Sequence, residues 1–199
     1  MDVEIVLFDG FDELDAVGPF EVLSNGRRAG ADLTVRLVSH EGRDRVTASH
    51  GLDVGVDGPL GEPDLLIVPG GGWSDGEGGV ARVVADGTLG EAVAKLHAAG
   101  TTVASVCTGA MVLAEASLLD DRPATTHHVA HDDLAAVADR RDARVVDDGD
   151  ILTAGGVTSG IDLALFLLDR EFGAEIADSV ARTLEHDRSE DVVVTAGGD

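Results

Sequence analysis

The sequence predicts an α/β fold with a mostly parallel central sheet and helices on both of its faces. Short, nearly continuous apolar runs alternate along the chain with longer segments in which apolar residues recur at helical spacing. These runs lack the polar–apolar alternation of half-exposed strands, which indicates strands buried on both faces. No linker or internal repeat interrupts the pattern, so residues 1–199 are assigned to a single domain.

Each apolar run ends at a turn or at a change of periodicity. The predicted strands cover residues 3–8, 33–39, 64–68, 101–106, 144–146 and 151–153. The predicted helices cover residues 12–25, 89–99, 108–116, 132–139, 158–172 and 174–184. Pro19 is an irregularity within the first helix, whereas Gly100 provides a C-terminal cap for the second. Residues 190–199 are expected to form a last strand or a loose tail.

The charge balance limits the partners of the chain. It has 38 acidic and 14 basic residues, a formal net charge of −24 and a single lysine, Lys95. Such a chain repels nucleic acid and anionic membrane surfaces, so we expect neither as a partner. The acidic excess is typical of a salt-rich cytoplasm, where ions screen the repulsion. The N-terminus has no signal-peptide pattern and no apolar stretch is long enough to span a bilayer, so we expect a cytoplasmic protein.

Cys107 is the only cysteine, which excludes an internal disulfide and a cysteine-rich metal site. It stands between the predicted strand 101–106 and a helix that opens with Thr108 and Gly109. This strand–turn–helix arrangement is typical of a nucleophile elbow. A helix N-terminus also offers free amides and a partial positive charge, so we expect a lowered pKa for the Cys107 thiol. An inert, buried cysteine is the alternative.

The carboxyl ends of parallel strands meet at one edge of a sheet, and a run of three glycines there is a candidate for the same site. Gly70, Gly71 and Gly72 follow the strand 64–68 and let a backbone approach a ligand closely, and the amide of Gly71 with that of Thr108 would form an oxyanion hole. A flexible loop is the alternative. Trp73 is next in the chain and is a candidate wall of the substrate pocket, or else a packing aromatic.

Acidic and histidine side chains supply candidates for proton transfer. Asp15 lies between apolar neighbours and is a candidate proton donor or acceptor with a raised pKa, with Glu21 as its competitor. His127 is a candidate base or orienting group beside the cysteine. The spacing of His127, His128 and His131 also permits a metal site, but no carboxylate or thiol partner is specified, so we expect no metal and no cofactor.

The segment 153–162 forms another strand-to-helix turn. We expect Val157 in this turn to lie near the site. Asp162 stands in a pattern similar to a capping box, and we expect it to cap the helix that begins near residue 158.

Taken together, these motifs resemble the ThiJ/PfpI superfamily. The resemblance spans about residues 3–185 and rests, in order, on LDAVGPFEVL at 14–23, PGG at 69–71, SVCTGA at 105–110, RPATTH at 122–127 and TAGGVTSGID at 153–162. It implies a flavodoxin-like three-layer sandwich, commonly dimeric, with a nucleophile at Cys107 and an acidic partner at Asp15. It further implies oxyanion donors at the amides of Gly71 and Thr108, and a histidine near the cysteine at His127.

Within the superfamily the chain looks most similar to the isocyanide hydratase branch and to the sensor domains of AraC-type regulators. The resemblance implies that water is added to a small electrophilic substrate; the alternatives are glyoxalase or glycation-repair activity on α-oxoaldehydes and a non-enzymatic redox or ligand sensor. Peptidase activity is less expected, because Thr108 replaces the histidine of the protease-like members. His128 replaces a tryptophan frequent in the hydratase branch, and His186 lacks the His-x-Glu pattern of glutamine amidotransferases.

Overall fold

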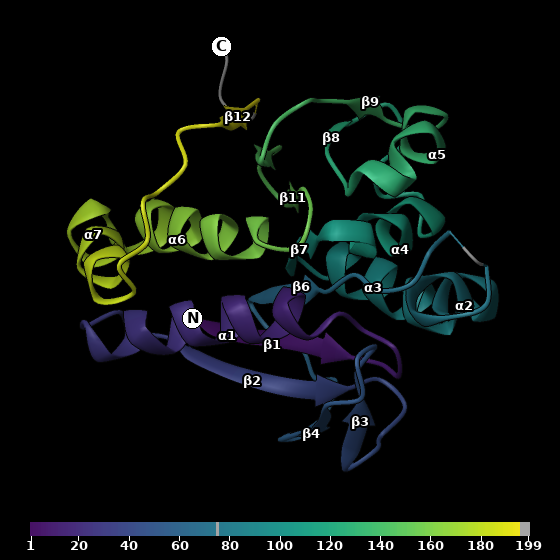
Figure 1. Ribbon diagram of the computed structural model, residues 1–199, viewed down its shortest axis with the longest axis horizontal. Coiled ribbons are helices and arrows are strands. Elements are labelled where there is room, and N and C mark those ends of the chain that lie inside the picture. The colour runs from purple at the N-terminus through teal and green to yellow at the C-terminus, as the bar shows by residue number, and fades with distance from the viewer. Residues whose placement is uncertain (75, 196–199) are drawn as a thin grey trace.

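The computed structural model describes residues 1–74 and 76–195 and is built around one eight-stranded sheet (Figure 1). The strand order is β12-β10-β11-β7-β6-β1-β2-β5. The strands are β1 (Asp2–Leu7), β2 (Thr34–Ser39), β5 (Gly58–Pro59), β6 (Leu65–Val68), β7 (Thr102–Val106), β10 (Val145–Asp147), β11 (Ile151–Ala154) and β12 (Val192–Val194). Only the β10–β11 pair of this sheet is antiparallel, which confirms the mostly parallel sheet.

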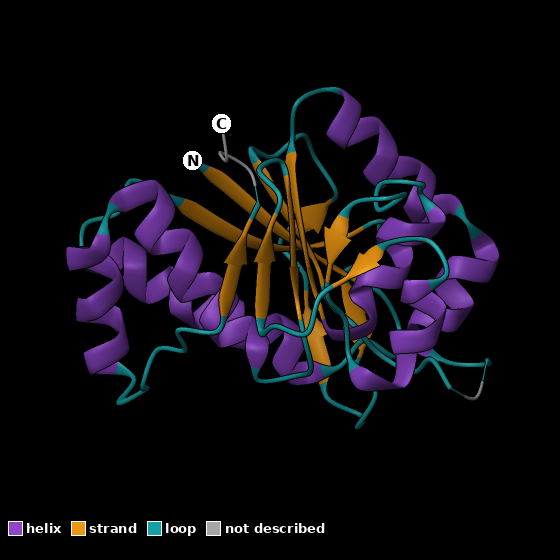
Figure 2. Cartoon of the chain, turned by 90° about the horizontal axis from the view of Figure 1, so that it is seen from above, coloured by secondary structure: helices purple, strands orange, loops and turns teal. Residues whose placement is uncertain are grey.

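Helices cover both faces of the sheet (Figure 2). On one face α1 (Glu13–Arg28), α6 (Ser159–Phe172) and α7 (Ala174–Thr183) pack against one another. On the other face α2 (Gly79–Asp86), α3 (Thr88–Ala98) and α4 (Ala110–Glu115) form a second layer, and the short α5 (His131–Ala135) packs on α4. The result is the predicted flavodoxin-like sandwich. In the described residues, no helix combines the length and apolarity needed to span a bilayer.

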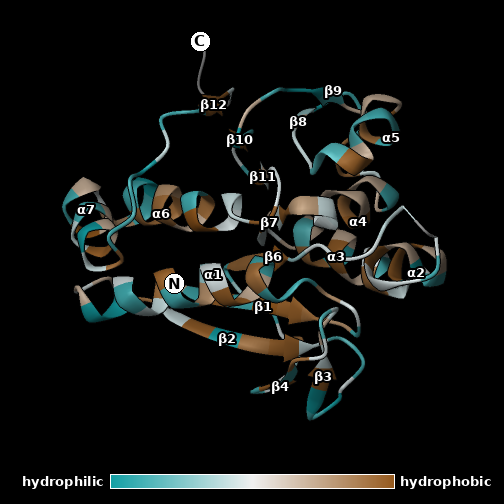
Figure 3. Ribbon diagram, in the orientation of Figure 1, coloured by the Kyte–Doolittle hydropathy of each residue, from teal (hydrophilic) through white to brown (hydrophobic). Residues whose placement is uncertain are grey.

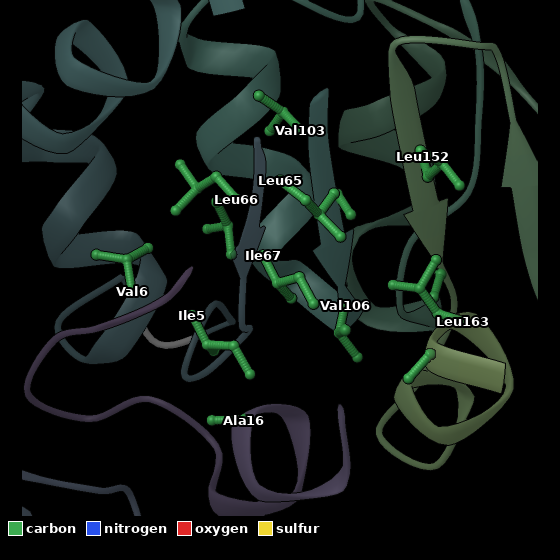
Figure 4. Close-up of a cluster of buried hydrophobic side chains, with 14 of the residues drawn as sticks. Ile5, Val6, Ala16, Leu65, Leu66, Ile67, Val103, Val106, Leu152 and Leu163 are labelled. Carbon is green, nitrogen blue, oxygen red and sulfur yellow. The ribbon is translucent and has the colours of Figure 1, made fainter. Parts of the chain in front are cut away.

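The central strands are buried because helices cover them from both sides. All four residues of β6 are buried, which explains its unbroken apolar run. Figure 4 shows how these strands and the flanking helices interlock, with side chains that include Ile5, Val6, Ala16, Leu65, Leu66, Ile67, Val103, Val106, Leu152 and Leu163. Each of the Val, Leu and Ile side chains among them contributes about 1.5–3 kcal/mol when fully buried. Figure 3 shows the same layering by hydropathy, with hydrophobic residues concentrated on β1 and β2 and hydrophilic residues on the outer turns of the helices.

Several predicted elements differ in extent from those of the structure. The first helix continues to Arg28, and the segment predicted as a helix at 132–139 contains only α5 before β9 (Asp139–Arg140). β9 pairs with β8 (Pro123–Ala124), and β3 (Arg45–Thr47) pairs with β4 (Asp53–Gly55). These strands and α2 were not predicted, because two or three residues carry no periodic signal and glycines precede α2. The end of the chain forms β12, and residues 196–199 of the expected tail lie outside the described residues.

Candidate active site

Cys107 occupies the sharp turn that the sequence predicts at the end of β7. Its φ angle is +58°, in the left-handed region, and it opens the 3₁₀ turn η1 (Cys107–Gly109) that leads into α4. Its backbone N–H donates to the Gly155 carbonyl at 2.9 Å, and its carbonyl accepts from Thr126 Oγ1 at 2.8 Å. Gly109 permits this turn, since a Cβ there would lie 2.3 Å from the Val68 carbonyl oxygen. The turn after β11 and the loop after β8 thus hold the cysteine in a strained conformation.

Asp15 lies beside this cysteine, in the first turn of α1, and its side chain is completely buried. Its Oδ2 accepts a hydrogen bond from the Gly70 amide at 2.9 Å. The Cys107 thiol lies against the carboxyl group, while Oδ1 has no hydrogen-bond partner of standard geometry among the described residues. The competing carboxylate, Glu21, is exposed further along the same helix. The structure therefore pairs the thiol with Asp15.

Burial controls the protonation of both groups. It raises the pKa of Asp15 to about 8, and the nearby negative charge of Asp12 acts in the same direction. Burial also raises the pKa of the Cys107 thiol to about 12, with a further contribution from Asp15, against the opposing effect of amides from Val157 and Thr108. The expected lowering of the Cys107 pKa is therefore wrong in this structure: desolvation and a neighbouring carboxylate outweigh the helix N-terminus. Near neutral pH the pair is a thiol beside a carboxylic acid.

Gly70 brings these two side chains together, a role that the sequence analysis missed. A Cβ on Gly70 would lie 2.7 Å from Asp15 Oδ2, 2.8 Å from Cys107 Cβ and 2.8 Å from the Thr108 nitrogen. Any larger residue would force these groups apart. The signal in the sequence is the position of Gly70 immediately after Pro69, at the end of β6, where the glycine run predicts the close approach of a ligand rather than of Asp15 and Cys107.

Both amides that are predicted to donate to an oxyanion already make hydrogen bonds within the chain. The Gly71 amide donates to Thr108 Oγ1 at 2.9 Å, and the same hydroxyl donates to the Gly71 carbonyl at 2.7 Å. The Thr108 amide is directed to the Cys107 sulfur. Gly72 accepts a hydrogen bond from the Ala81 amide at 3.0 Å and so connects the glycine turn to α2. The oxyanion-hole assignment remains a prediction.

His127 and Val157 approach the site from two other segments. The Val157 amide is directed to the Cys107 sulfur. The His127 ring lies against Gly156, where a Cβ would be 2.7 Å from its Cδ2, and its centroid is 4.1 Å from that of His128. Burial lowers the pKa of His127, as does the proximity of His128. In the described part of the chain no hydrogen bond joins His127 to the thiol, so its predicted role there stays untested.

Trp73, the predicted wall of the substrate pocket, lines a different cavity. Its Nε1 donates to Asp133 Oδ2 at 2.8 Å, and its ring lines a surface cavity with Val129 and residues of α2. The structure thus groups Cys107, Asp15 and the Thr108 and Val157 amides, and it does not add Trp73 to that group.

Asp162 does not cap α6, contrary to the prediction. It accepts hydrogen bonds from Arg144 Nε at 2.8 Å, His186 Nε2 at 3.0 Å and the Ser189 amide at 3.1 Å. The first residue before α6, Thr158, provides no side-chain cap either. Asp162 instead ties the C-terminal segment to α6. The local sequence pattern does not predict these contacts, because the partners lie 18 to 27 residues away in the sequence.

One group of side chains has the composition of a metal site. Asp12, Glu13 and His50 place three ligand atoms within 4.8 Å of one another. His50 Nδ1 and Glu13 Oε2 form an ion pair at 2.6 Å, and Asp12 Oδ1 caps α1 by accepting from the Leu14 amide. These contacts account for the group without an ion. Among the described residues, the predicted alternative at His127, His128 and His131 does not bring three ligand atoms together in this way.

A cysteine with a left-handed backbone conformation at the end of a parallel strand, beside a buried carboxyl group, places the chain among flavodoxin-like proteins with a cysteine in a sharp strand-to-helix turn. The sequence model of the DJ-1/PfpI family matches residues 1–170, and the chain belongs to this family.

Individual relatives agree with this assignment. The chain is 35% identical to the isonitrile hydratase of Pseudomonas putida, over 94% of this chain and 78% of that protein. It is 34% identical to the HTH-type transcriptional regulator CdhR of Pseudomonas aeruginosa, over 90% of this chain and 53% of the regulator. Among solved structures, a ThiJ/PfpI family protein from Pseudomonas syringae has a TM-score of 0.83 at 25% identity and covers 94% of this chain and 76% of its own. The predicted resemblance is therefore confirmed.

Proposed function

We propose that the protein is a cysteine-dependent enzyme that adds water to a small electrophilic carbon, with isocyanides as the substrate class. The observation that carries this proposal is the contact of the buried Asp15 carboxyl group with the Cys107 thiol. The similarity to an isonitrile hydratase supports the choice of substrate. An isocyanide is uncharged, and its terminal carbon accepts both a nucleophile and a proton, which suits a neutral thiol–acid pair.

The reaction has two stages. In the first, the Cys107 sulfur and one proton add to the isocyanide carbon, forming a C–S and a C–H bond and leaving a thioimidate, R–N=CH–S–Cys107. Asp15 delivers the proton to carbon and receives the proton of the thiol. In the second, water adds to the same carbon, the C–S bond breaks, the sulfur regains a proton, and the formamide R–NH–CHO leaves.

Burial of the pair sets the protonation states that this reaction needs. A raised pKa keeps Asp15 in its acid form near neutral pH, so that it has a proton to donate. The amides of Thr108 and Val157 face the sulfur and stabilise the negative charge that develops on it when the C–S bond forms and breaks.

Substitution of the two side chains tests the proposal. Cys107→Ala should abolish hydration of a simple alkyl isocyanide, and Asp15→Asn should slow it by about 10²–10⁴-fold. Asn retains an oxygen acceptor for the Gly70 amide, so this variant should fold. Glu21→Gln, an exposed carboxylate on the same helix, is the matched control and should keep wild-type rates. Formamide production by Cys107→Ala at the wild-type rate would refute the mechanism.

The other two activities remain alternatives. Turnover of an α-oxoaldehyde to a hydroxy acid, with no formamide from isocyanides, would replace hydration by a glyoxalase or glycation-repair activity on the same thiol. The similarity to a transcriptional regulator supports a sensor role. A sensor would gain two oxygen atoms on Cys107 under mild peroxide while turning over neither substrate. A thiol with a raised pKa oxidises slowly, and this weighs against the redox sensor.

We also expect a homodimer in the cytoplasm of an organism with high internal salt. Leu14 and Val17, on α1 beside the site, are 38% and 36% exposed, an apolar surface suited to a second copy. Sedimentation equilibrium measures the mass directly, and a monomer at high protein concentration would contradict the expectation.

A further inference from the structure

A second cavity, of about 330 Å³, lies behind the cysteine turn. We call it the Ser159 cavity; its walls include Thr126, His127, Asp142, Arg144, Gly155 and Ser159. Two of these residues bond to the backbone of Cys107, through the Gly155 carbonyl and Thr126 Oγ1. Cys107 itself is not among the described residues that line the cavity. The cavity is therefore a neighbour of the proposed active site and has its own walls.

Ser159 is the unusual group in this cavity. It is the first residue of α6 and only 2% exposed, yet in the described part of the chain its hydroxyl has no hydrogen-bond partner. The Ser159 hydroxyl is not among the fully enclosed polar atoms that lack a partner in the described residues, so it is open to the cavity. Because the residue lines the cavity, a ligand there can supply the missing hydrogen bond.

The charges around the cavity select the kind of ligand. Arg144 is cationic and about one third exposed; it is held in place by Asp162 and Thr158. Asp142 and Asp191 line the same cavity and are both exposed. These carboxylates, with a net charge of −24 on the whole chain, disfavour a simple anion. A simple cation could pair with these carboxylates but would leave Ser159 Oγ and the Arg144 guanidinium without an acceptor.

We propose that the Ser159 cavity binds a small zwitterion, a molecule with a carboxylate and an ammonium group joined by a short aliphatic chain. The carboxylate accepts hydrogen bonds from Ser159 Oγ and from the Arg144 guanidinium. The ammonium group faces Asp142 and Asp191. The cavity is a binding site separate from the proposed reaction at Cys107.

A titration of the ¹⁵N-labelled full chain with three matched probes tests this proposal. The probes are 4-aminobutanoate, butanoate and butylamine, which share a carbon chain and differ only in their end groups. We expect 4-aminobutanoate to shift the amide resonances of Gly155, Gly156 and Ser159 in a saturable manner at millimolar concentration, and the other two to bind at least about threefold more weakly. Glycine and β-alanine extend the series to shorter spacings. Saturation by none of the zwitterions, or equal binding of butylamine or butanoate, would overturn the proposal.

Two substitutions locate the site without disturbing the fold. Ser159→Ala and Asp142→Asn remove groups that make no hydrogen bond or ion pair to the described residues. Each should weaken 4-aminobutanoate by about threefold to tenfold. Asp132→Asn, an exposed carboxylate outside the cavity, is the matched control. Cys107→Ala should bind as the wild type does, so a failure of the proposed catalysis leaves this result unaffected. Unchanged affinity in both Ser159→Ala and Asp142→Asn would place the ligand elsewhere and refute the assignment.

Discussion

The Gly70 amide donates a 2.9 Å hydrogen bond to Asp15 Oδ2 from a position that has no room for a side chain. Gly70→Ala would place a methyl group 2.7 Å from that oxygen and 2.8 Å from Cys107 Cβ. We expect this variant to lose about 1–3 kcal/mol of unfolding free energy and to separate the thiol from the acid, with a loss of activity beyond the loss of stability. Urea unfolding and initial rates measure the two effects.

Gly72, two residues further along the chain, supplies the control for this experiment. A Cβ on Gly72 would meet the Gly78 backbone at 3.4 Å, an ordinary contact, so Gly72→Ala should keep nearly wild-type stability and rate. If both variants behave alike, the close approach at Gly70 does not set the geometry of the site.

The rate of isocyanide hydration should depend on pH through Asp15. Because the carboxyl group donates its proton from the acid form and its pKa is raised to about 8, we expect kcat/KM to be constant at lower pH and to fall as the pH rises through 8. A simple alkyl isocyanide has no ionisable group, so the profile reports the free enzyme. A reaction that begins with a free thiolate would show the opposite trend, a rate that increases toward the pKa of the thiol.

The sequence predicts the order of strands and helices well, because apolar runs and helical spacings indicate which residues are buried. It also places Cys107 correctly in a sharp turn, because a strand followed by a cysteine and small residues is typical of such a turn. Asp15 is identified by a local contrast, a carboxylate among apolar neighbours. Each of these features is encoded in a short local segment of the chain.

The features that the sequence does not predict depend on contacts between distant segments. The pKa of Cys107 is set by burial under several elements and by Asp15, which the local helix N-terminus does not reveal. The residues around Asp162 resemble a capping box. In the structure its carboxylate oxygens accept hydrogen bonds from Arg144 and His186 instead of from the first amides of α6. Trp73 follows the glycine turn directly, yet its indole donates to Asp133, 60 residues further along the chain, and lines a different cavity.

Asp162 should be important for stability. Burial alone would raise its pKa, but hydrogen bonds from His186, the Ser189 amide and Arg144 lower it below the usual range. Since the pKa is lower in the folded state, the ionised form stabilises the fold at neutral pH, and this contribution is lost as the pH falls through the folded-state pKa. We expect Asp162→Asn to cost about 2–4 kcal/mol at neutral pH and less in acid. Chemical unfolding at several pH values measures this difference.

A second ion pair on the same helix provides the comparison. Asp169 pairs with Arg188, but its side chain is 36% exposed, so Asp169→Asn should cost no more than about 1 kcal/mol. An equal cost for the two variants would mean that the connections of Asp162 to the C-terminal segment add nothing to stability.

The acidic surface makes a prediction about salt. With a formal net charge of −24, like charges repel across the folded chain, and unfolding relieves that repulsion by increasing their separation. The screening length falls from about 30 Å at 0.01 M salt to about 3 Å at 1 M, so the unfolding free energy should rise steadily with KCl over this range. Thermal unfolding followed by circular dichroism measures this rise, and sucrose at matched osmolarity controls for effects of solute exclusion. Because protonation removes the repulsion, the salt dependence should weaken as the pH approaches the sequence pI of about 4.3. A midpoint that is insensitive to KCl at neutral pH would show that the charges are too well separated to repel, and the expected adaptation to high salt would then be wrong.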